Sequence, residues 1–159
     1  MPQERVEPQE LLSFARKFIG VPYKFGAKAK LYKKPQGGYC YQAWLVGGAV
    51  RLVSKVLRID CSGFIYLVYR AKGIELPHGS YFQVRSRYTR PCTVMEALAS
   101  AGALLFVHDK RKDRIVHVVM SNGEGGIIEA NGYYGKVIER KMPTGYCNVA
   151  RLVQRVNYV

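Results

Sequence analysis

The hydrophobic pattern of this chain changes period near residue 103, and this change limits the possible folds more than any other feature. Before it, apolar residues recur at helical spacing, whereas after it short β-rich runs alternate with turns. The runs are Ala103–Val107, Ile115–Met120, Gly126–Glu129, Lys136–Arg140 and Val149–Val153. Asn122-Gly123, between two of them, is typical of a hairpin turn. Helices followed by an antiparallel meander predict an α+β fold.

Helical signals occur in several segments that precede the strands. Glu7–Ile19 carries an apolar stripe at helical spacing and ends at Gly20, a residue that favours helix termination. Ser80–Arg85 is expected to form a short helical turn. Thr93 begins a capping box, which predicts a short helix that ends at Ser100.

A cysteine stands directly before another helical pattern. Cys61 lies between Asp60 and Ser62, residue types that accept hydrogen bonds from the free amides of a helix's first turn. A thiol at the positive end of a helix dipole is favoured as the thiolate, which is a nucleophile. A buried structural cysteine explains the segment equally well. The apolar residues expected on one face of this helix are Phe64, Ile65, Val68 and Tyr69.

Length and composition predict a single domain over residues 1–159. A chain of 159 residues, 48% of them hydrophobic, can bury a substantial core. The longest apolar run, Ala43–Val50, is far shorter than the ~20 residues of a membrane span, so no span is expected. Because the N-terminus has no signal-peptide pattern, we expect synthesis in the cytoplasm and any export by another route.

The chain is strongly basic, with 25 Lys and Arg residues against 11 Asp and Glu and a net charge of +14. Such a charge favours polyanionic partners such as nucleic acid, anionic lipid or a wall polymer rich in carboxylate and phosphate. The basic segments at 85–90 and 110–114 match no nucleic-acid-binding module, so no nucleic-acid partner is expected. Cys40, Cys61, Cys92 and Cys147 lack metal-ligand spacing, and we expect no metal, no cofactor and mostly reduced thiols.

Residues 27–57 interrupt the pattern of helices that surrounds them. Residues 27–38 are basic and rich in Gly, Pro and Lys, and they are expected to form a mobile loop. Tyr39–Leu57 is apolar and contains Trp44, and its residues Val53, Val56 and Leu57 could line a helix. Gly47-Gly48 weakens that helical pattern because glycine is a poor helix former.

Two of the strand-like runs contain a polar residue. His117 interrupts one run and Glu129 the next, and the hairpin signal lies midway between them. This spacing predicts cross-strand neighbours on one face of the sheet. A lone histidine in an apolar strand is commonly a hydrogen-bonded core residue. Together with Cys61, however, the pair indicates nucleophilic catalysis, in which an imidazole moves the thiol proton and a third group fixes its tautomer.

In this order and spacing, the motifs resemble the NlpC-type family of cell-wall cysteine peptidases. The resemblance covers the chain from about residue 8 onwards, except for residues 27–57, which would be an insertion that is atypical of the family. The matching motifs are Asp60–Phe64, Val68–Arg70, Gly73–Pro77, Ser80-x-x-Gln83, Gly102–Phe106, His117–Val118 and Ile128–Ala130, with the turn Gly20–Gly26 upstream.

The resemblance implies a papain-like fold, in which the nucleophile begins a helix that packs on a C-terminal antiparallel sheet. It implies that Cys61 is the nucleophile, His117 the general base and then acid, and Glu129 the group that orients the imidazole. The implied reaction is hydrolysis of peptidoglycan stem peptides, at the bond between γ-D-glutamate and a diamino acid. The implied substrate contacts are Tyr23, Asp60 and Ser80.

The chain departs from the family pattern at several positions, which keeps other functions open. Glu129 stands where histidine is more common, His78 replaces the arginine after Leu-Pro, and Ala103 replaces an aspartate. The alternatives are an acyltransferase or deamidase on the same fold, and a non-catalytic wall-binding module. We expect a monomer that binds stem peptides or muropeptides and, further, anionic wall polymers. It would reach the wall through a phage tail or another secretion route.

Overall fold

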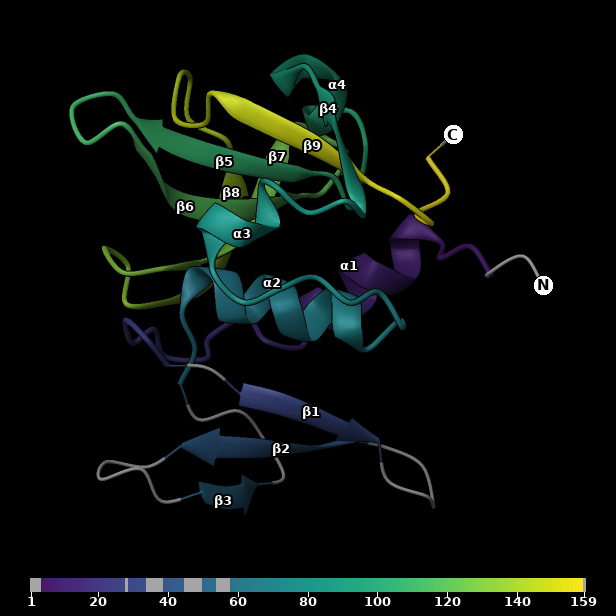
Figure 1. Cartoon of the computed structure of the whole chain (residues 1–159), viewed down its shortest axis with the longest axis vertical. Helices are drawn as coiled ribbons and strands as arrows, with labels where there is room; N and C mark the ends of the chain where they lie inside the picture. The colour runs from purple at the N-terminus through teal and green to yellow at the C-terminus, as the bar shows by residue number, and fades with distance from the viewer. Residues whose placement is uncertain (1–3, 28, 34–38, 45–49, 54–57, 159) are drawn as a thin grey trace.

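The structure is a computed structural model that describes residues 4–27, 29–33, 39–44, 50–53 and 58–158 (Figure 1). Its helices are α1 (Pro8–Arg16), α2 (Cys61–Arg70), α3 (Ser80–Gln83) and α4 (Val94–Leu98). A small N-terminal group of strands comprises β1 (Ala29–Lys33), β2 (Tyr39–Trp44) and β3 (Val50–Val53). The remaining strands are β4 (Thr89–Cys92), β5 (Leu104–Asp109), β6 (Arg114–Ser121), β7 (Gly126–Asn131), β8 (Lys136–Lys141) and β9 (Val149–Val153).

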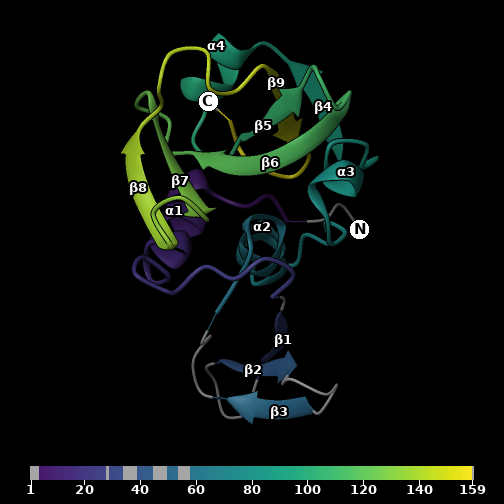
Figure 2. The ribbon, with the colours of Figure 1, turned by 90° about the vertical axis from the view of Figure 1, so that its left-hand side faces the viewer.

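An antiparallel sheet of order β4-β9-β5-β6-β7-β8 forms the centre of the fold. Strands β5 to β8 make the predicted meander. Strand β9 then returns to pair with β5 and places Ala150 opposite Leu105, so that β9 lies between β5 and β4. Helices α1 and α2 pack on one side of the sheet and α4 on the other (Figure 2). The predicted α+β class, with the Cys61 helix packed on an antiparallel sheet, is confirmed.

Helix α1 is shorter than the predicted Glu7–Ile19, because the last residues of that segment form turns that end at Gly20 with a φ of +94°. Ile19 therefore lies outside the helix and is 47% exposed, which corrects its assignment to the buried stripe. Phe18 is buried all the same, and its ring packs edge-on against Phe64 of α2, with centroids 6.0 Å apart. This contact joins the two helices.

Helix α2 is buried on more than the one predicted face. Leu67 has no exposed surface, like the predicted core residues Phe64 and Val68. The helix lies between the large sheet and β1, so that apolar side chains are required on both sides (Figures 1 and 2). Within the described part of the chain, no helix has the length and apolar character to cross a bilayer.

The secondary structure expected within residues 27–57 was wrong for the strands that the structure describes there. Ala29–Lys33 is a strand, although it falls in the expected loop, and β2 and β3 replace the expected helix. The three strands form an antiparallel sheet of order β1-β2-β3. Aromatic and β-branched residues in short runs favour strands, and cross-strand pairing outweighed the weak helical spacing. Val56 and Leu57 lie outside the described residues.

Candidate active site

Cys61 is the first residue of α2, and Asp60 caps the helix as the sequence predicts. The Asp60 carboxylate accepts a hydrogen bond from the Gly63 amide at 2.7 Å and one from the Ser62 hydroxyl at 3.4 Å. Asp60 is buried, whereas Cys61 is half-buried. The thiol therefore lies at the positive end of the helix dipole and remains accessible, as a nucleophile must be.

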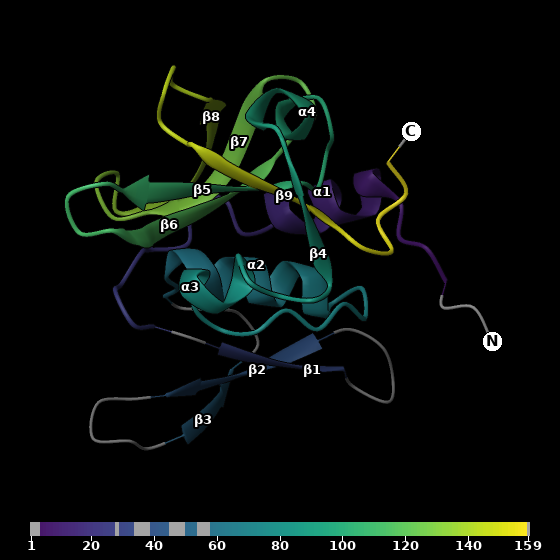
Figure 3. The ribbon, with the colours of Figure 1, turned by 45° about the horizontal axis from the view of Figure 1, so that its top comes forward.

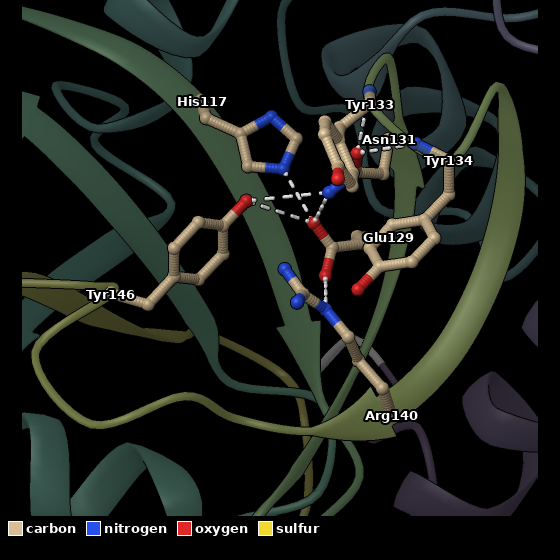
Figure 4. A network of polar contacts seen from close by, with 7 residues as sticks. All are labelled: His117, Glu129, Asn131, Tyr133, Tyr134, Arg140 and Tyr146. Carbon is tan, nitrogen blue, oxygen red and sulfur yellow. Dashed lines mark hydrogen bonds and ion pairs between the residues drawn. The ribbon is translucent and has the colours of Figure 1, made fainter.

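His117 and Glu129 meet across the hairpin formed by β6 and β7. The ladder between these strands is short and pairs Met120 with Ile128 and Ser121 with Ile127. In that register His117 and Glu129 are diagonal neighbours on the same face rather than direct partners. The His117 Nε2 atom lies 2.9 Å from Glu129 Oε1 (Figure 4). The predicted cross-strand contact is therefore present.

The thiol acts on the same imidazole. The interaction with Cys61 raises the pKa of His117, and Glu129 contacts Nε2, which leaves Nδ1 available to the sulfur. Burial alone would lower the pKa of His117, but the hydrogen bonds with Cys61 and Glu129 outweigh it and raise this pKa to about 9. Cys61 and Glu129 thus both raise the pKa of His117.

Glu129 is fully buried and receives several hydrogen bonds (Figure 4). Its Oε1 accepts hydrogen bonds from the side-chain amide of Asn131 at 2.7 Å and from the Tyr146 hydroxyl at 3.0 Å, in addition to its contact with His117. Its Oε2 accepts from Arg140 Nε at 2.8 Å. Burial would raise the pKa of Glu129, but the hydrogen bonds from His117, Arg140 and Asn131 outweigh it and lower this pKa to about 2.

The residues around Glu129 were missed by the sequence analysis. Asn131 could have been found, because it follows Glu129 by two positions and faces the same side of the strand. Arg140 lies on β8, and Tyr146 lies in the segment before β9, and neither carries a local motif. The pKa of Tyr146 is raised by burial and by the negative charge of Glu129, so its hydroxyl stays a proton donor.

The predicted substrate contacts take different positions. Tyr23 pairs with Ile59, two residues before the nucleophile, and burial and then the charges of Cys61 and Asp60 raise the pKa of its hydroxyl. Ser80 begins α3, which packs against α2 and β6 (Figure 3), and in the described residues no polar side-chain contact joins it to Cys61. His78 stacks on Tyr66 of α2, with ring centroids 3.8 Å apart.

Gln83 is a further buried polar residue next to the nucleophile helix. Its Nε2 donates to the Ser62 carbonyl and to the Pro77 carbonyl, each at 2.9 Å. The side chain therefore fixes the segment that carries His78 to the first turn of α2. Among the described residues, no group of three or more His, Cys, Asp or Glu side chains is arranged to hold a metal ion.

A comparison with protein families and one with curated proteins give consistent results. The model described as "NlpC/P60 family" matches residues 20–156. A γ-D-glutamyl-L-lysine dipeptidyl-peptidase from Bacillus cereus is 34% identical over 71 residues, which are 45% of this chain and 20% of the relative. The chain thus spans about a fifth of the length of that relative.

Solved structures extend the likeness to almost the whole chain. The peptidoglycan hydrolase RipB from Mycobacterium tuberculosis superimposes with a TM-score of 0.66 at 22% identity, over 95% of this chain and 65% of that one. The P60 domain of an antigen from Mycobacterium avium subspecies paratuberculosis gives the same score and identity, over 95% and 96%. These similarities establish the fold, which is the papain-like fold predicted from the sequence.

Proposed function

Because the chain belongs to the NlpC/P60 family, we propose that it is a cysteine peptidase that hydrolyses peptidoglycan stem peptides. Cys61 would be the nucleophile, His117 the general base and then acid, and Glu129 the orienting group. The observation that carries the proposal is the 2.9 Å contact of His117 Nε2 with the buried carboxylate of Glu129, on an imidazole whose pKa is also raised by Cys61. Membership of this family supports cell-wall peptides as the substrate.

The first half of the reaction forms a thioester. His117 takes the thiol proton, and the Cys61 sulfur attacks the carbonyl carbon of the scissile amide. The amide of Cys61 at the start of α2 can donate to the developing oxyanion, and one such donor typically lowers the barrier by about 3–4 kcal/mol. As the C–N bond breaks, His117 returns the proton to the leaving amine.

The second half releases the acid product. His117 removes a proton from water, the resulting hydroxide attacks the thioester carbonyl, and the C–S bond breaks with reprotonation of the sulfur. Throughout, Glu129 holds Nε2 as the protonated ring nitrogen, so that Nδ1 faces the sulfur. Glu129 replaces the histidine more common in the family and, as a carboxylate, stabilises the imidazolium more strongly than a neutral ring would.

The bond that we propose as the target joins γ-D-glutamate to a diamino acid. The name of the Bacillus cereus relative, a γ-D-glutamyl-L-lysine dipeptidyl-peptidase, supports this choice. An amine could instead attack the same thioester, which would make the protein an acyltransferase. In a deamidation, Cys61 would attack a side-chain amide, and ammonia would leave as the thioester forms. Those alternatives would leave wall fragments uncut and would be recognised by the mass of the product.

A basic turn beside the site supports an anionic polymer as a further partner. The turn between β5 and β6 exposes Lys110, Arg111 and Lys112, and β6 begins at the exposed Arg114, three residues before His117. Asp109, the last residue of β5, accepts hydrogen bonds from the amides of Arg111 and Lys112. Cleavage of whole walls should therefore fall with added salt more than cleavage of a small muropeptide, because salt screens exposed charges.

Mass spectrometry of purified peptidoglycan after digestion tests the assignment. The wild type should release fragments cut after γ-D-glutamate, and Cys61→Ala should release none. Cys92→Ala is the matched control, because Cys92 is another half-buried free thiol and should leave cleavage unchanged. Cleavage by Cys61→Ala would rule out the nucleophile, and an intact wall with a modified acyl donor would favour acyl transfer.

A further inference from the structure

The two oxygens of Glu129 have different partners. Oε1 contacts His117, Asn131 and Tyr146, whereas Oε2 contacts Arg140 at 2.8 Å. No part of Glu129 is exposed to solvent, so water cannot stabilise a negative charge there. A buried carboxylate without a nearby cation takes up a proton and becomes neutral.

The cations around Glu129 differ in permanence. The imidazole of His117 is positive only in part of the proposed cycle, because it releases its proton to the leaving amine. The guanidinium of Arg140 is positive at every working pH. The other titratable groups near Glu129 are the hydroxyl of Tyr146 and the thiol of Cys147, and burial raises the pKa of both, that of Cys147 to about 12. Beyond His117 lies the thiol of Cys61.

Arg140 is held in place by aromatic rings. Its guanidinium lies over the ring of Tyr146 at 4.9 Å and over that of Tyr134 at 5.2 Å, both within the range of a cation–π contact (Figure 4). Tyr146 also donates to Glu129, so the same ring steadies the cation and the anion. In the described part of the chain, Arg140 is the only permanent cation in contact with Glu129.

We propose that Arg140 is a positioning residue that keeps Glu129 ionised and aimed at Nε2 while His117 alternates between its charged and neutral forms. This role rests on the proposed function, since it presumes that His117 transfers protons. Without Arg140, neutral His117 would leave Glu129 as a buried anion with no cation beside it. Glu129 would then bind a proton, and a protonated acid stabilises an imidazolium poorly.

The test measures Glu129 itself as well as activity. The carboxyl carbon of Glu129 is followed by NMR in protein labelled at glutamate, with its signal assigned from Glu129→Gln. Arg140→Gln should raise the pKa of Glu129 by about 1–3 units, the usual influence of one adjacent opposite charge. Arg140→Lys, which keeps the charge, should leave the pKa of Glu129 close to its wild-type value. In muropeptide cleavage, Arg140→Gln should lower kcat more than it raises KM and move the acidic limb of the pH profile upward.

Matched variants separate positioning from folding. Arg16→Gln breaks another Arg–Glu pair, that of Arg16 with Glu139 at 2.9 Å, and should change neither the titration of Glu129 nor the pH profile. In a Glu129→Gln background, replacing Arg140 by Gln should have no further effect on kcat. An unchanged pKa of Glu129 in Arg140→Gln would overturn the proposal. The titration of Glu129 needs no substrate, so it tests the role of Arg140 even if the wild type cleaves no wall fragment. Absence of cleavage by the wild type would refute the proposed function and not the role of Arg140.

Discussion

Replacing Gly63 by alanine should destabilise the protein, although alanine is the better helix former. Gly63 is the third residue of α2, and its amide donates to the Asp60 cap at 2.7 Å. A Cβ at this position would lie 2.8 Å from the same carboxylate oxygen, 3.3 Å from the Ala27 carbonyl and 3.3 Å from Ile59 Cγ1. Two of these neighbours cannot move easily, because one is backbone and Ile59 is fully buried. The Asp60 carboxylate must therefore move, which breaks its hydrogen bond with the amide of residue 63.

The magnitude follows from opposing effects. Alanine in place of glycine stabilises a helix by about 1 kcal/mol. Loss of an N-cap hydrogen bond destabilises by about 0.5–2 kcal/mol, and an extra methyl group in a packed site by about 1–3 kcal/mol. The expected result is a loss of roughly 0.5–4 kcal/mol in the free energy of unfolding. The amide of Cys61 and its sulfur lie in the same helical turn, so alkylation of Cys61 should slow as well.

Denaturant unfolding and the rate of Cys61 alkylation by iodoacetamide measure both effects. Asp60→Asn serves as a control, because asparagine is an equally good cap and should preserve stability. Asp60→Ala removes the carboxylate that the new methyl group would strike, so Gly63→Ala should be less destabilising in that background. If Gly63→Ala proves as stable as the wild type or more stable, the collision with the cap does not govern this helix and the reasoning fails.

Further predictions concern the imidazole and the thiols. Glu129→Gln should slow turnover and lower the pKa of His117 from about 9 towards 6.5. The alkaline limb of the pH–rate profile should then move to lower pH. An unchanged profile would show that Glu129 does not orient His117. Because the folded-state pKa of His117 is raised, its contribution to stability is complete below about pH 6.5 and is lost as the pH rises through about 9. The free energy of unfolding should therefore fall by about 3 kcal/mol across this range. The fall should be absent in His117→Gln when unfolding is measured over the same pH range. Iodoacetamide should label Cys61 first and Cys147 last, since burial raises the pKa of the Cys147 thiol to about 12; mass spectrometry of the labelled peptides would expose the opposite order.

Local signals were sufficient where one short segment decides its own structure. The capping residues Asp60 and Thr93 each accept a hydrogen bond from an amide of the first turn, as the sequence predicts. The twelve-residue interval from His117 to Glu129 places both on one face of a hairpin, since strand periodicity and turn position fix the register. The expected helix over residues 39–57 had no such decisive signal, and in Tyr39–Trp44 and Val50–Val53 cross-strand pairing produced strands in its place.

The sequence by itself therefore determined the α+β class, the start of the Cys61 helix and the pairing of His117 with Glu129, because each depends on residues close in the chain. Tertiary structure alone decided the return of β9 to β5, the burial of α2 on opposite sides and the surroundings of Glu129. Arg140 reaches that carboxylate because β8 pairs with β7 in a register that places Ile138 opposite Glu129 and Arg140 diagonally beside it. The environment of a buried charge is set by whichever strands and loops converge there, and no local pattern encodes that convergence.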